Sequence, residues 1–161
     1  QLAEPTWWGG GPGEGEVARN PRVEAYLSAA RRGARVRVLL DGHFDDPAHW
    51  NSNAATIREL AAAARSEGLD LQARLGDPTG GGIHNKMVLV HLTGAGSQRA
   101  HWVHLGSLNG SEVAHKANRE VALQLESEPV HAYLARVFAW DWATTYALAL
   151  PALGTSRAGT P

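Results

Sequence analysis

Two short polar patterns stand at the edges of apolar runs and contain residue types that catalysis uses. His84 and Lys86 lie two residues apart in the segment 83–90, which reads as a β-strand, so both side chains are expected on one face. Ser107 and Asn109 repeat this spacing after the next apolar stretch. If the two strands are neighbours, an imidazole, an ammonium, a hydroxyl and an amide converge at their ends.

This set of groups suits a phosphodiester. An imidazole can attack phosphorus, while ammonium, hydroxyl and amide donors stabilise the negative charge that grows on the non-bridging oxygens. Further along the chain, the Glu120 carboxylate can accept a hydrogen bond from one ring nitrogen of His84 and leave the other nitrogen free to attack. Such chemistry needs no metal ion, and we expect no cofactor.

Other polar groups are weaker candidates for a functional site. A His-x-Lys pair alone means little, because two polar residues on one strand face usually meet only solvent. His101 and His104 are three residues apart on a strand and face opposite sides, which is poor geometry for one metal ion, so we interpret both as structural. A loop holds His43, Asp45, Asp46 and His49. It can bind a cation or shape a substrate entrance, but a solvated loop is the simpler interpretation.

The elements that must position these residues follow from caps and periodicity. Asn20 and Pro21 predict the start of a helix that Gly33 ends, and a second helix is expected from near Asn53 to Gly68. An amphipathic helix is expected over residues 130–142. Strands are predicted over 35–40, 69–75, 83–92, 100–105 and 120–125, with a hairpin turn over 93–99.

Alternating helices and strands predict an α/β fold, a mixed β-sheet flanked by helices on both faces. The site is then expected at the strand ends between Lys86 and Asn109. We divide the 161 residues into a glycine-rich lead-in loop (1–16), a single domain (17–150) and a disordered tail (151–161).

Composition limits the possible partners. The chain has 15 basic and 16 acidic residues, so it lacks a global positive field and must hold any anionic substrate locally. It contains no Cys, which removes disulfides and thiolate metal sites. No apolar run approaches the length of a membrane span.

The ordered set His84-x-Lys86, Gly106-Ser107-x-Asn109 and Asn118-x-Glu120 resembles the HKD motif of the phospholipase D superfamily, over roughly residues 17–142. The resemblance implies a phospholipase D-like fold and a covalent phosphohistidine on His84. It also implies that Lys86 and Asn109 bind phosphate oxygens, that Ser107 and Asn118 support them, and that Glu120 orients His84.

Two features depart from the family pattern. The family usually has Asp five residues after its Lys, and His91 stands there, which puts local support in doubt more than the chemistry. The hairpin over 93–99 also lengthens the gap between the sub-motifs, and a longer turn is tolerated at small entropic cost.

The resemblance implies a phosphodiesterase, a phospholipase D-like hydrolase or nuclease, acting on phospholipid or nucleic acid. The alternatives are a phosphatidyltransferase of the cardiolipin synthase type and a catalytically silent binding domain. The family uses two His residues, one to attack and one to protonate the leaving oxygen. We therefore expect a second HKD motif from the same longer chain or from a homodimer partner. The start at Gln1 without Met favours the second half of a longer bacterial protein, and such chains often belong to exported proteins of the cell envelope.

Overall fold

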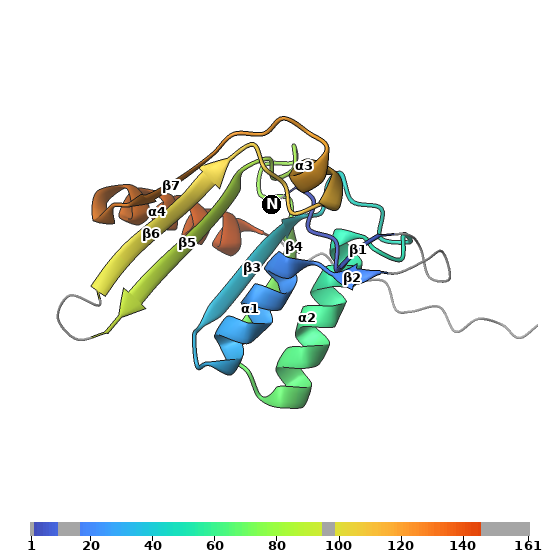
Figure 1. Cartoon of the computed structure of the whole chain (residues 1–161), viewed down its shortest axis with the longest axis horizontal. Helices are drawn as coiled ribbons and strands as arrows, with labels where there is room; N and C mark the ends of the chain where they lie inside the picture. Colours follow the sequence, from blue (N-terminus) through green and yellow to red (C-terminus); the bar gives the residue numbers. More distant parts are fainter. Residues whose placement is uncertain (1, 10–16, 95–98, 146–161) are drawn as a thin grey trace, which may run out of the picture.

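The computed structural model of the chain describes residues 2–9, 17–94 and 99–145. The tail predicted over 151–161 and the tip of the hairpin predicted over 93–99 lie outside these residues. In chain order the elements are β1 (Trp7–Trp8), β2 (Ala18–Arg19), α1 (Pro21–Arg31), β3 (Val36–Asp41), α2 (Asn53–Glu67), β4 (Leu71–Gly76), β5 (Lys86–Thr93), β6 (Arg99–Gly106), α3 (Glu112–Lys116), β7 (Ala122–Glu126) and α4 (Glu128–Thr144) (Figure 1).

The first layer is built from α1, β3, α2 and β4. The Asn20 side chain accepts from the Arg22 backbone N–H and caps α1, while Ser52 caps α2 in the same way and Gly68 ends it in the left-handed conformation. Strands β3 and β4 are parallel, with Val36 opposite Leu71 and Asp41 opposite Gly76. Their carboxyl ends therefore lie side by side.

One hydrophobic core holds this layer together. Helices α1 and α2 lie next to each other and bury their apolar faces on the β3–β4 pair (Figure 1). Each fully buried Leu or Val stabilises the fold by about 1.5–3 kcal/mol. The core consists of Val23, Leu27, Ala30, Val38, Leu40, Ala54, Ile57, Leu60, Leu71 and Leu75.

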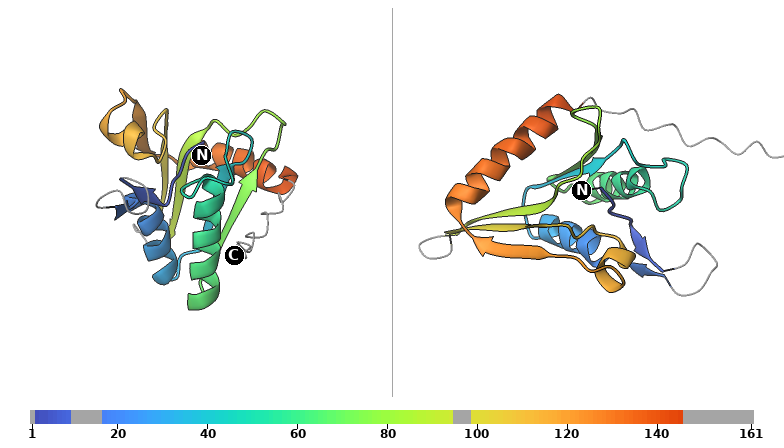
Figure 2. Two further views of the ribbon diagram at one scale, coloured as in Figure 1. Left: turned by 90° about the vertical axis from the view of Figure 1, so that its right-hand side faces the viewer. Right: turned by 90° about the horizontal axis from the view of Figure 1, so that it is seen from above.

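The second layer is the antiparallel sheet β5–β6–β7, with α4 packed on β5 and β6 (Figure 2). In the register, Lys86 lies opposite Gly106, and Gly106 lies opposite Ala122. The Arg74 side chain of β4 reaches the end of α4, where it donates to the Trp142 carbonyl at 3.4 Å and lies over the indole ring. Helix α4 thus lies on the side of the molecule away from α1 and α2.

The predicted α/β class is confirmed, with parallel and antiparallel strand pairs and helices on opposite sides. Within the described residues the strands form three hydrogen-bonded sheets instead of one mixed sheet. The sequence did not indicate the short elements β1, β2 and α3, because two to five residues are too few to show a period. None of the described helices is both long enough and apolar enough to cross a membrane.

The segment predicted as a lead-in loop belongs partly to the packed fold. Glu4 and Thr6 are buried, and Trp7 pairs with Arg19 in the β1–β2 ladder. The Thr6 hydroxyl bonds to that of Thr56 at 3.0 Å. The segment is rich in Gly and shows no apolar period, so contacts to distant residues order its described part.

Candidate active site

The candidate site lies where the antiparallel sheet meets the carboxyl end of the parallel pair. Strands β5 and β6 are neighbours, as the two sub-motifs require, and the Lys86–Gly106 pair closes their ladder on this side. Ser107 follows directly and donates its backbone N–H to the Val121 carbonyl at 2.9 Å. The structure thus brings the two sub-motifs to one edge.

Lys86 is buried, with 5% of its surface exposed, and its ammonium donates to the His84 carbonyl oxygen. Burial lowers the pKa of Lys86, because the cation leaves water, while the charges of Glu120 and Asp41 act in the opposite direction. A cation held in this way is ready to attract the oxygens of a phosphate group.

Three of the expected residues form a hydrogen-bonded group on the β6–β7 side. The Ser107 hydroxyl donates to the Glu120 carboxylate and accepts from the Val121 N–H at 3.1 Å. The Asn118 amide donates to the other carboxylate oxygen of Glu120 at 3.2 Å. These bonds, from Ser107 first and Asn118 second, lower the pKa of Glu120, and Lys86 adds to the effect. Glu120 is therefore an anion opposite the Lys86 cation.

Gly106 allows this close approach. A Cβ atom at this position would lie 2.1 Å from the Val121 carbonyl oxygen, which is backbone and cannot swing away. Any side chain here would push the segment carrying Glu120 away from Ser107. This is a physical reason for Gly at the start of the Gly106-Ser107-x-Asn109 pattern.

His84 is placed differently from the expectation. Strand β5 begins at Lys86, so His84 lies in the extended segment before it, exposed to solvent and not fixed by the strand ladder. Within the parts of the chain that the structure describes, its imidazole makes no hydrogen bond. The expected contact between Glu120 and His84 is not formed among the described residues, and the Glu120 carboxylate instead accepts from Ser107 and Asn118. The predicted strand start at residue 83 is wrong by three residues.

Asp41 is a site residue that the sequence analysis missed. It is fully buried at the end of β3, and one carboxylate oxygen accepts from the Ile83 N–H at 2.6 Å while the other accepts from the Phe44 N–H at 2.7 Å. It thus anchors the chain one residue before His84, and its charge acts on Lys86. The available signal was an acidic residue at the carboxyl end of a buried strand, where α/β folds place ligand sites.

Asn109 lies on the loop after β6 and keeps an unused acceptor. Its side-chain oxygen is buried and has no hydrogen-bond partner in the described residues. A buried polar atom without a partner costs free energy, so a group from outside the chain can improve this position. The unused atom is an acceptor and can take only a donor such as a hydroxyl. Its expected role, binding phosphate oxygens, would instead use the NH2 group of Asn109.

The polar loop after β3 has structural partners. Both Asp45 oxygens accept from the start of α2, from the Asn53 N–H at 2.8 Å and the Ala54 N–H at 2.9 Å. His43 bonds to Asp77 at 3.1 Å. These contacts agree with the simpler interpretation of the loop.

His91, His101 and His131 cluster at the other end of the sheet from Lys86. His91 stands opposite His101 in the register, and their rings stack with centroids 4.4 Å apart, while His131 of α4 lies 5.1 Å from His101. His104 is on the other face, within 3.4 Å of the Gln124 amide. A broad hollow beside His91 and His101 thus opens at the end of the sheet opposite Lys86. At the position where the family usually has Asp, the His91 ring thus stacks on His101.

Comparison with known protein families gives a match over most of the chain. The family model described as "Cardiolipin synthase, PLD-like domain" matches residues 17–142. No curated protein and no solved structure gives a significant match.

Proposed function

We propose, from the premise that this chain belongs to the PLD-like domain family of cardiolipin synthase and so to the phospholipase D superfamily, that it cleaves phosphodiesters through a covalent bond to His84. The superfamily contains phosphodiesterases and phosphatidyltransferases. The observation that carries the proposal is the juxtaposition of Lys86 with the Ser107–Glu120 pair at the joined ends of β5 and β6.

The proposed first step is an in-line displacement at phosphorus. A ring nitrogen of His84 forms the new N–P bond, and the bond from phosphorus to the leaving oxygen breaks. Lys86 and Asn109 bind the non-bridging oxygens, where negative charge grows. The leaving oxygen takes a proton from a second histidine, which acts as general acid.

The second step reverses these roles. Water or an alcohol attacks the phosphohistidine and loses its proton to the second histidine, the N–P bond breaks, and His84 is released. Water gives hydrolysis and an alcohol gives transfer. The description of the matching family as cardiolipin synthase favours transfer to an alcohol as the second candidate function.

Glu120 has a revised role in this proposal. Its contacts to Ser107 and Asn118 and its charge opposite Lys86 support the phosphate-binding side of the site. Orientation of the His84 ring by Glu120 then requires a rearrangement on substrate binding, as is common for catalytic hydrogen bonds in free enzymes.

The second histidine must come from a second motif, because residues 84–120 supply one HKD-like set. We propose that the other half of a longer chain or a second copy provides it. Both options would be contradicted if the 161-residue chain sediments strictly as a monomer and still turns over substrate.

Trapping the adduct tests the function. An active assembly is quenched with base during turnover of bis(p-nitrophenyl) phosphate, and its peptides are analysed by mass spectrometry. We expect an acid-labile, base-stable phosphoryl adduct on the peptide containing residues 83–86. His84→Asn should lose both adduct and turnover, whereas the control His91→Asn should keep both. An adduct on another histidine, or native turnover by His84→Asn, refutes the mechanism. A silent domain would release no nitrophenol at all.

A further inference from the structure

We propose that an N-terminal strap, residues 3–9, positions the loop that carries Asn109. The strap lies outside the family-matched residues 17–142, so nothing in the HKD pattern refers to it. The catalytic value of Asn109 rests on the proposed function. The positioning itself rests on contacts within the chain.

The strap binds the peptide groups of Gly110, the residue after Asn109. The Gly110 N–H donates to the Ala3 carbonyl at 2.8 Å, and the Gly110 carbonyl accepts from the Trp8 indole N–H at 3.0 Å. The Asn20 amide donates to the same carbonyl at 2.9 Å. Both polar groups of this residue are thus held from outside its own loop, which fixes the position of the adjacent Asn109.

A buried carboxylate lies directly against the same loop. Glu4 is fully buried, and a Cβ atom on Gly110 would lie 2.1 Å from its Oε1, so the glycine backbone rests on the carboxylate. The Arg22 guanidinium stands 3.4 Å from Glu4 and also donates to the Leu108 carbonyl at 3.5 Å. The ion pair therefore reaches the residues on both sides of Asn109.

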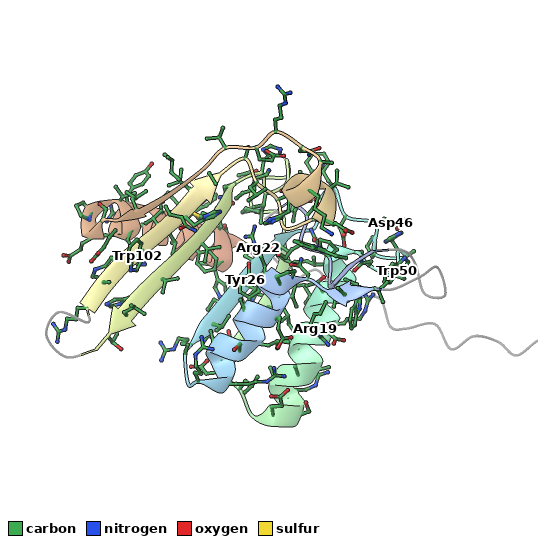
Figure 3. The ribbon with its side chains drawn as sticks, viewed as in Figure 1. Arg19, Arg22, Tyr26, Asp46, Trp50 and Trp102 are labelled. Atoms are coloured by element: carbon green, nitrogen blue, oxygen red, sulfur yellow. The ribbon has the colours of Figure 1, made fainter. Side chains whose placement is uncertain are left out.

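Burial raises the pKa of Glu4, and the Arg22 charge opposes this shift. The Tyr26 hydroxyl donates to the carboxylate at 3.4 Å, and Figure 3 shows Arg22 and Tyr26 on α1. A buried ion pair contributes little net stability, because desolvation offsets the attraction, so its placement is better explained by fixing a position. The position fixed here is that of the Asn109 loop.

The end of the strap also holds α3, which links the two later sub-motifs. The Gly9 N–H donates to the Glu112 carboxylate at 2.7 Å, and the Trp8 ring lies 5.1 Å from the His115 ring. A five-residue helix such as α3 is not stable alone, so these contacts help to keep it formed. The chain from Asn109 to Asn118 is thereby held along its length.

The strap is itself tied to the packed layer. The Glu4 N–H donates to the Asn53 side chain at 2.9 Å, and the Thr56 hydroxyl donates to the Glu4 carbonyl at 2.7 Å. Both partners belong to α2, whose apolar face lies in the core. Through these hydrogen bonds the strap connects the packed helix α2 to the Asn109 loop on the other layer.

A matched pair of variants tests the proposal. Trp8→Phe removes the indole donor and keeps an aromatic ring. Trp7→Phe makes the same change at a ring that packs against Arg19, and in the described part of the chain no hydrogen bond joins the Trp7 side chain to the loop. In the active assembly we expect Trp8→Phe to lower kcat about tenfold with KM within about twofold, because a displaced donor loses transition-state contacts. Deuterium uptake by the peptide of residues 107–117 should rise, with uptake in α2 unchanged. Trp7→Phe should match the native protein in all three quantities.

Gly110→Ala gives a second measurement, with a rescue. The added methyl group overlaps the Glu4 carboxylate, so we expect kcat to fall about 100-fold. Adding Glu4→Asp shortens the side chain, keeps its charge, and should restore about tenfold of the loss. A purely structural defect would instead deepen in the double variant.

The outcomes separate the two proposals. If the native assembly does not turn over substrate, the proposed function fails, and the uptake data alone decide on the strap. Native kcat together with native uptake in Trp8→Phe overturns the positioning role. A uniform rise in uptake, including α2, also overturns it, because the strap would then support the whole fold and not this loop.

Discussion

The two layers of the molecule differ in how they are packed. Every residue of the hydrophobic core comes from the parallel layer, α1, β3, α2 and β4. The antiparallel layer, residues 86–144, buries Val103 and Ala114 but exposes many large apolar side chains: Val90, Leu92, Trp102, Val113, Val121, Leu123, Tyr133 and Trp140. Yet the motif residues lie in or next to this second layer.

This difference shows where the site obtains its rigidity. A groove separates the layers, with Arg22 and Tyr26 of α1 on one wall and Trp102 of β6 on the other (Figure 3). Across it, Asp41 anchors Ile83 beside the nucleophile candidate, and the strap anchors Gly110 beside Asn109. The candidate site residues thus lie on the loosely packed layer, and polar contacts from the well-packed layer hold them in place.

Removing core volume should expose the contrast most strongly. Leu60 of α2 is fully buried, so Leu60→Ala should lower the free energy of unfolding by about 2–5 kcal/mol, the cost of a lost side chain plus a cavity. Leu123 of β7 is 59% exposed, and Leu123→Ala should change the stability by less than about 0.5 kcal/mol. Urea denaturation measures both. Equal losses would mean that the second layer is packed as tightly as the first.

The next effect concerns activity and stability at one residue. Lys86→Met removes the cation that the proposed mechanism places against the phosphate oxygens, so turnover should fall by about 10²–10³. The free energy of unfolding of the Lys86→Met variant should stay within about 1 kcal/mol of the native value, because an apolar side chain replaces a buried ammonium. Kinetics on bis(p-nitrophenyl) phosphate and urea denaturation of the same preparation provide the measurement. Full unfolding of this variant would show that Lys86 is mainly a structural ion.

A smaller effect should appear with pH at the outer end of the second layer. Burial lowers the pKa of His131, and the charges of His101 and His91 lower it further. The unfolded chain then binds more protons than the folded one below the ordinary histidine pKa of about 6.5. The free energy of unfolding should therefore fall as pH drops from about 8 to about 5, through the ordinary histidine pKa. His131→Asn should show a shallower fall, and an identical pH profile in the two proteins contradicts this account.

The smallest expected effect is that of chelation. In the proposed mechanism Lys86 and Asn109 supply the charge stabilisation that a divalent ion would otherwise provide. Turnover of the active assembly should therefore stay within about twofold after treatment with EDTA. Dialysis followed by the nitrophenol assay measures it. If turnover is lost in EDTA and restored by a metal, Lys86 does not have this role, and the polar loop around His43 and Asp45 becomes the candidate cation site.

Local sequence patterns predicted much of the scaffold. The cap at Asn20, the stop at Gly68 and the apolar periods of the strands predicted α1, α2, β3 and β4 to within two residues. The pairing of β5 with β6 also followed, because a hairpin joins strands that are close in sequence. Helix α4 begins and ends two residues beyond the predicted bounds of 130–142, which is the usual uncertainty at frayed ends.

The sequence predicted which residue types make up the candidate site but predicted fewer of their contacts. His84, Lys86, Ser107, Asn109, Asn118 and Glu120 were chosen from spacing and order. Their spacing predicted that Ser107 and Lys86 meet at one edge, because strand geometry repeats every two residues. It did not predict that β5 starts after His84, since no local signal separates an extended approach from a paired strand.

The sequence by itself thus determined the identities of the reactive groups, the helices with clear caps and the hairpin that joins the two sub-motifs. Only the tertiary structure decided the partners of Glu120, the anchoring role of Asp41 and the place of the strap. Trp8 and Gly110 are 102 residues apart and still share a hydrogen bond. Caps and periods act within a few residues along the chain, whereas the burial of a group such as Glu4 depends on side chains that only the completed fold brings to it.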